Sequence, residues 1–140
     1  PLIDAFEEAK QKKIILSHGV SCHSLPALRV AARNPWVDVN LVRINPQGKV
    51  MDGEGDTYFE ESTEESVPKV LHQIQIMKEN GHGVIGMKLI GNGRFKDAEE
   101  RKRSIQFVMQ KSRGDAAVIG CKSETEIDEA IDNVNMALAK

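Results

Sequence analysis

The stretch AAVIGCKSETEIDE, residues 116–129, decides how the rest of the chain is interpreted. Its first four residues are apolar and predict a short buried strand, which ends at Gly120. A polar loop follows over residues 121–123, and then an amphipathic pattern predicts a helix over residues 124–139. The first backbone N–H groups of such a helix have no partner within the helix, so they attract anions. The stretch therefore predicts a strand–loop–helix unit with an anion-receptive loop.

The same strand-then-helix pattern occurs three more times before this stretch. Predicted strands span residues 13–20, 36–44 and 84–90, predicted helices span 24–33, 67–80 and 97–112, and a further helix over 2–12 precedes them. Ser24 and Asp97 are the predicted N-caps of two of these helices. Strands that alternate with helices predict an α/β fold with a parallel sheet and right-handed crossovers. Four consecutive (βα) units, taken as a single domain over residues 1–140, fit a small open sheet or half of a TIM-type (β/α)8 barrel.

The predicted connection over residues 45–66 is longer than an ordinary loop, so we expect it to be functional or mobile. It is rich in glycine and in acidic residues, namely Asp52, Glu54, Asp56, Glu60 and Glu61. These residues do not have the spacing of an EF-hand calcium loop. We therefore expect a long, acidic, solvated flap over the mouth of the barrel.

Composition excludes several classes of function. Hydrophobic residues make up 40% of the chain and charged residues 29%, as in soluble globular proteins. A net charge of −2 gives no electrostatic case for nucleic acid or for an anionic membrane surface. No apolar run approaches the ~20 residues that span a bilayer. Two cysteines are too few for a disulfide framework, so we expect a cytoplasmic protein.

The chain begins with Pro1 and enters a predicted helix almost at once, which favours a processed product or a fragment of a longer chain. Half a barrel has two open sheet edges and an exposed apolar inner face, and both invite association. We therefore expect the chain to pair with a second copy as a homodimer, or with a missing N-terminal half.

Three groups of residues could bind an anionic ligand, and each has an ordinary structural alternative. Lys122 and Ser123 either bind a phosphate at the helix N-terminus or form a solvated helix start. Gly91 and Gly93 either let the backbone approach a pyrophosphate or only turn the chain. Lys88 either faces a ligand at the barrel mouth or extends into solvent.

The segment around Cys22 gives little support for metal or nucleophile chemistry. His18 and His23 lie near it, but no second ligand pair with zinc-type spacing follows, and Cys121 belongs to another strand. A cysteine and a histidine that are adjacent in sequence do not thereby form a nucleophile–base hydrogen bond. We therefore expect no metal site, and we assign no catalytic residue in this chain.

Several strand ends resemble those of the aldo/keto reductase family. Residues 19–22, GVSC, resemble the G-V-S-N of that family, and residues 42–46, VRINP, resemble its V-E-Y-N-P. Residues 86–93, GMKLIGNG, stand where the family has Y-S-P-L-G-x-G. Residues 119–123, IGCKS, with Glu129 in the next helix, resemble the eighth-strand loop that binds the 2′-phosphate of NADPH. The resemblance covers nearly the whole chain and maps it onto strands five to eight of the barrel.

The resemblance implies the NADP(H)-binding C-terminal half of an oxidoreductase that transfers hydride between this cofactor and a small-molecule carbonyl substrate. The cofactor contacts that it implies, together with those proposed above, are Ser21, Cys22, Lys88, Gly91, Gly93, Gly120, Lys122, Ser123 and Glu129. The catalytic tetrad of the family lies on its first four strands, so the resemblance implies chemistry only for a longer parent chain. Leu41 and Met87 stand where the family has its nicotinamide-contacting glutamine and tyrosine.

Two alternatives to the enzyme hypothesis remain open. In the first, the chain is a stable half-barrel that self-associates and binds phosphate or nucleotide at Lys122 and Ser123 without catalysis. In the second, it is a structural fragment that binds no ligand.

Overall fold

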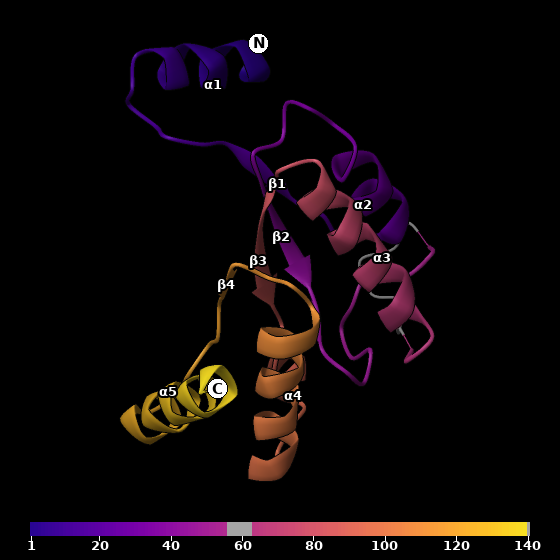
Figure 1. Ribbon diagram of the computed structural model, residues 1–140, viewed down its shortest axis with the longest axis vertical. Coiled ribbons are helices and arrows are strands. Elements are labelled where there is room, and N and C mark those ends of the chain that lie inside the picture. Colours follow the sequence, from indigo (N-terminus) through magenta and orange to yellow (C-terminus); the bar gives the residue numbers. More distant parts are fainter. Residues whose placement is uncertain (56–62, 140) are drawn as a thin grey trace.

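The computed structural model describes residues 1–55 and 63–139 and has an α/β fold with one parallel sheet (Figure 1). The sheet has the strand order β1-β2-β3-β4, with strands β1 (Gly19–Ser21), β2 (Val39–Arg43), β3 (Gly83–Met87) and β4 (Ala116–Ala117). The helices are α1 (Leu2–Gln11), α2 (Leu25–Ala31), α3 (Ser66–Glu79), α4 (Ala98–Lys111) and α5 (Glu124–Leu138), with a short 3-10 turn η1 (Gly91–Gly93). The predicted order of four consecutive (βα) units is confirmed. That these units form half of a barrel stays a prediction.

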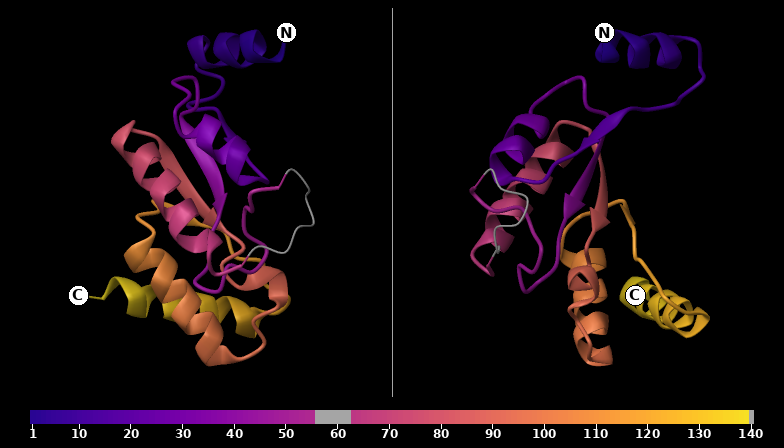
Figure 2. Two further views of the ribbon diagram at one scale, coloured as in Figure 1. Left: turned by 90° about the vertical axis from the view of Figure 1, so that its right-hand side faces the viewer. Right: turned by 180° about the vertical axis from the view of Figure 1, so that it is seen from behind.

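The hydrophobic core lies between the sheet and helices α2 and α3, which cover the same face of it (Figures 1 and 2), and Ile105 and Val108 of α4 extend this core. Side chains alternate between the two faces of each strand, so Val42 and Val84 point into this core and are at most 1% exposed. Their neighbours Leu41 and Ile85, which are partners in the β2–β3 register, lie on the opposite face and are only half-buried. No helix of the described residues covers that opposite face of β1–β3 (Figure 2).

The predicted N-caps are confirmed. The Ser24 hydroxyl accepts a hydrogen bond from the Ala27 N–H at 3.4 Å, and α2 begins at the next residue. Asp97 Oδ1 accepts from the N–H groups of Glu99 and Glu100 at 2.9 and 3.2 Å, which starts α4. These side-chain acceptors satisfy backbone donors that have no partner within the helix.

The first predicted strand is wrong over most of its length. Only Gly19–Ser21 pairs with β2, while Ile14 and Leu16 before it are 72% and 90% exposed. An apolar, β-branched pattern shows that a segment suits a strand, but the segment also needs a neighbouring strand with free backbone groups. Strand β2 begins only at Val39, after the turn at residues 34–38, so residues 13–17 have no such neighbour.

Helix α1 consequently lies apart from the sheet and buries none of its residues (Figure 1). It is held by the Phe6 ring, which meets the Trp36 and His18 rings edge-on at centroid distances of 6.1 and 6.4 Å. The Lys10 ammonium adds an ion pair with Asp38 at 2.5 Å. The amphipathic pattern correctly predicted a helix here, although the apolar face finds little to pack against.

The predicted loop over residues 45–66 is only partly described, because residues 56–62, and with them Asp56, Glu60 and Glu61, lie outside the described residues. The expectation of solvated acidic side chains holds for Glu54, which is exposed, but it is wrong for Asp52, which is 0% exposed. A backbone contact fixes the loop to the start of α2, since the Leu25 N–H donates to the Gly53 carbonyl at 2.8 Å. The charge of Arg43, itself buried, lies beside Asp52.

Candidate functional site

A cleft of about 640 Å³ opens beyond the carboxyl ends of β3 and β4. Its walls come from the segment after β3, the start of α4, the loop after β4 and the first half of α5. Ligands of parallel α/β proteins bind at this edge of the sheet. The lining mixes apolar side chains with charged ones, the charged ones being Lys88, Lys96, Arg101, Lys122, Glu126 and Glu129.

The structure brings part of the predicted site together in this cleft. The predicted residues that line it are Lys88, Gly93, Gly120, Lys122 and Glu129. Gly91 is buried beneath the Phe95 ring, where an added Cβ would meet ring atoms at 3.0 Å. Ser21 and Cys22 belong to the end of β1, at the sheet edge opposite β4, and are not among the residues that line the cleft.

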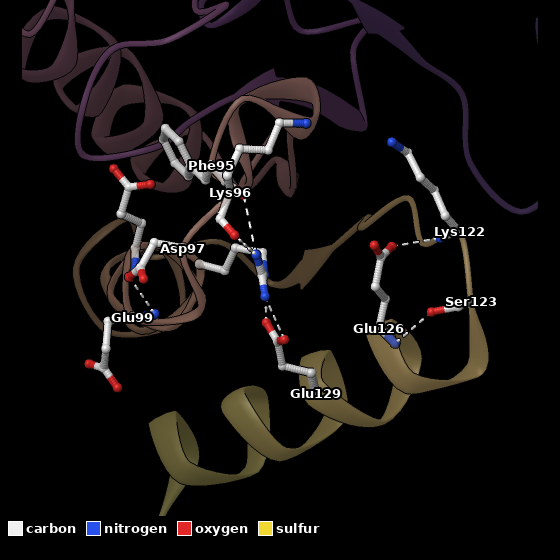
Figure 3. A network of polar contacts seen from close by, with 10 residues as sticks. Phe95, Lys96, Asp97, Glu99, Lys122, Ser123, Glu126 and Glu129 are labelled. Carbon is white, nitrogen blue, oxygen red and sulfur yellow. Dashed lines mark hydrogen bonds and ion pairs between the residues drawn. The ribbon is translucent and has the colours of Figure 1, made fainter.

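Two hydrogen bonds close the N-terminus of α5 (Figure 3). The Ser123 hydroxyl accepts from the Glu126 N–H at 3.3 Å, and the Glu126 carboxylate accepts from the Lys122 N–H at 2.7 Å. The first bond is that of an S-x-x-E capping box, but the Glu126 carboxylate accepts from the residue before the N-cap rather than from the Ser123 N–H. An anion at this helix start would therefore compete with Glu126 for the Lys122 N–H.

Lys96 is a site residue that the sequence analysis missed. Its ammonium end and that of Lys122 point toward each other from opposite walls of the cleft (Figure 3). Within residues 1–55 and 63–139, neither ammonium group makes a hydrogen bond or an ion pair. The sequence around Lys96 has no pattern that indicates a binding site. Its position opposite Lys122 becomes evident only from the fold.

The cleft wall also holds an ion pair between α4 and α5. The Arg101 Nε and Nη2 donate to the two carboxylate oxygens of Glu129 at 2.6 and 2.7 Å. This hydrogen-bonded pair raises the pKa of Arg101 and lowers the pKa of Glu129. Glu129, predicted as a cofactor contact, therefore has both carboxylate oxygens engaged by Arg101, a residue that the sequence analysis did not single out.

A second polar cluster lies at the carboxyl ends of β1 and β2. Asp52 Oδ1 is 3.8 Å from the Arg43 Nε, and burial raises the pKa of Asp52 to about 6, against the opposing charge of Arg43. Burial, followed by the nearby Asp52 charge, raises the pKa of the Cys22 thiol. A thiol with a raised pKa stays protonated at neutral pH and is a poor nucleophile.

The histidine beside this cluster is more exposed than its neighbours. Burial, followed by the charges of Arg43 and Lys88, lowers the pKa of His23. Over the described ranges, no three His, Cys, Asp or Glu side chains lie close enough together to hold a metal ion.

Fold and cleft together define an α/β protein whose parallel sheet carries a lysine-lined cleft at its carboxyl edge. Comparisons with protein-family models, with curated protein sequences and with solved structures each return no match. In the part of the chain that the structure describes, no helix is both long enough and apolar enough to cross a membrane.

Proposed function

We propose that this cleft binds the phosphate-bearing part of NADP(H), and that the chain is the cofactor-binding C-terminal half of an aldo/keto reductase-like oxidoreductase. The observation that carries the proposal is the pair of ammonium groups of Lys96 and Lys122, which face each other across the cleft (Figure 3). Neither has an ionic partner among the described residues. Two facing cations in a chain of net charge −2 favour an anionic ligand between them.

The remaining lining suits a nucleotide. Its volume of about 640 Å³ falls in the range of small-molecule sites. The apolar side chains of Ile90, Val118 and Ile119, which are at least partly exposed, supply surface against which an aromatic base can pack. Lys88 adds a third cation near the rim, where its Nζ donates to Asn92 Oδ1 at 2.9 Å.

The chemistry proposed for the parent protein is reduction of a carbonyl to an alcohol. The cofactor supplies the hydride when bound, and a proton donor outside this chain supplies the proton. The residues of this chain hold the phosphate groups and thereby orient the cofactor at the carboxyl edge of the sheet. Leu41 and Met87 offer only apolar contacts near the strand ends, so cofactor binding here depends on the phosphate-bearing end.

The test is a titration of the chain with NADPH, followed by fluorescence or calorimetry, with NADH as control. We expect NADPH to bind at least roughly tenfold more tightly, since a 2′-phosphate adds charge-assisted hydrogen bonds to the ligand. The Lys122→Ala variant should lose most of this preference. Lys111→Ala, at the exposed end of α4, is the matched control and should keep it. Absence of NADPH binding at millimolar concentration contradicts the proposal.

A second candidate is phosphate or nucleotide binding without catalysis, which is favoured because the acidic side chains that line the cleft, Glu126 and Glu129, are already engaged by the Lys122 N–H and by Arg101. The same titration separates the two. Equal affinity for NADPH, NADH and inorganic phosphate supports a general anion site, whereas selectivity for the 2′-phosphate supports the oxidoreductase.

A further inference from the structure

We propose that Arg101 is a positioning residue of this site, because it sets the separation between the backbone segments that carry Lys96 and Lys122. The inference rests on the proposed function and deepens it, since two lysines held at a fixed separation select a ligand with two separate phosphate groups.

The guanidinium of Arg101 is fastened to two different segments at once. Its Nε and Nη2 hold the Glu129 carboxylate of α5 at 2.6 and 2.7 Å. Its Nη1 donates to the backbone carbonyls of Lys96 and Phe95 at 2.6 and 3.4 Å. The planar guanidinium can make these contacts together, whereas the single ammonium of a lysine cannot reproduce the bidentate pair.

The first half of α5 depends on such a bridge, because the packing of α5 on the core is concentrated in its second half, where Val134 lies against it. Helix α5 buries only Asn133 and Ala137, both in its second half. In its first half, Ile127 is 47% exposed. The segment carrying Lys96 is anchored on the sheet side by Phe95, which is 3% exposed. The Arg101 bridge therefore fixes the first half of α5, and with it Lys122, relative to Lys96.

The fixed arrangement has an electrostatic consequence. The Lys96 and Lys122 ammonium groups repel each other across the cleft, and the described residues supply neither with a carboxylate partner. One phosphate at each ammonium relieves this repulsion only if the two phosphates have the matching separation. A ligand with a single phosphate can satisfy one lysine and gains nothing from their spacing.

The experiment compares the affinities of adenosine 2′,5′-bisphosphate and adenosine 5′-monophosphate for the wild-type chain and its variants. We expect the wild type to prefer the bisphosphate by roughly tenfold. Arg101→Met and Glu129→Gln should each abolish most of this preference, while the affinity for the monophosphate changes by less than about twofold. Arg101→Lys should not restore the preference, because it keeps the charge but not the bidentate geometry. Arg103→Met, on the exposed side of α4, is the control and should behave as the wild type.

Circular dichroism checks that each variant folds, and if Arg101→Met does not, the milder Glu129→Gln and Arg101→Lys variants carry the test. An equal loss of affinity for both ligands, or an unchanged ratio, overturns the role of Arg101. If the wild type fails to bind NADPH at all, the proposed function itself is wrong. If it binds NADPH and the variants keep the wild-type ratio, only the present inference is wrong.

Discussion

The two sides of this molecule are held together by different forces. On one side, α2 and α3 pack on the sheet through side chains that exclude water, and Leu28, Ile74 and Met77 are at most 1% exposed. On the other side, α5 leaves Ile131 and Met136 52% and 48% exposed, and hydrogen bonds from Arg101 and Gln110 tie it to α4. The proposed ligand cleft lies on the polar side.

This difference locates stability and binding in separate parts of the chain. Buried apolar area is the main favourable contribution to folding, so the α2–α3 side should carry most of the free energy of unfolding. Segments held by few buried contacts open more easily, and ligand-binding segments often belong to this class. We therefore expect substitutions on the α2–α3 side to lower global stability, and substitutions on the α5 side to have smaller, more local effects.

The largest expected effect comes from Met77→Ala in the packed side. Loss of a fully buried methionine should lower the free energy of unfolding by about 2–5 kcal/mol, since it removes apolar contacts and leaves a cavity. Met136→Ala in α5 is the matched control and should change it by less than about 0.5 kcal/mol. Urea denaturation of both variants measures the contrast. Equal losses would show that α5 is packed as tightly as α3.

The same contrast explains which features could be predicted from the sequence. The helices and the order of the units follow from local signals, such as the caps Ser24 and Asp97 and the apolar spacing that the packed side requires. The failed part of the first strand depended on a partner that no local pattern reveals. Likewise, Lys122 could be found beside a helix start, whereas Lys96 and Arg101 acquire a role only because the fold brings their segments against α5.

The buried carboxyl group of Asp52 should make the stability of the protein depend on pH. Its pKa is about 6 in the folded protein against an ordinary value of 3.8, so the folded state holds the proton over a pH range in which the unfolded chain has released it. Stability is therefore greatest below the unfolded pKa and falls as the pH rises through about 6. The raised pKa of Asp52 therefore lowers the free energy of unfolding by about 3 kcal/mol between acidic and neutral pH.

Urea denaturation of the wild type and of Asp52→Asn between about pH 4 and pH 7 measures this effect. The variant should lack the decline, because an amide does not titrate in this range. The pKa values of Asp38 and Asp115 are lowered, so these carboxylates stabilise the folded state when they are ionised. That stabilisation is lost only as the pH falls, and it is lost equally in the wild type and in the variant. Parallel pH profiles for the two proteins would show that Asp52 is not buried in solution.

The smallest effect is expected from removing a serine N-cap, which occurs once on the α2–α3 side and once on the α5 side. Ser24 caps α2 in the packed side and Ser123 caps α5 beside the cleft, with hydrogen bonds of 3.4 and 3.3 Å to the capped N–H groups. Each serine-to-alanine change should cost its helix about 1 kcal/mol. Because α2 cannot loosen without exposing Leu25 and Leu28, the Ser24→Ala loss should appear in global unfolding by urea.

The Ser123→Ala loss should appear instead as faster amide hydrogen exchange confined to the first turns of α5, because that half of the helix can open without exposing the core. Glu126→Gln keeps an acceptor for the Lys122 N–H and should leave exchange in α5 nearly unchanged. If Ser123→Ala lowers global stability as much as Ser24→Ala does, the two sides unfold as one cooperative unit. In that case the cleft belongs to the core, and the ligand would stabilise the whole fold rather than α5 alone.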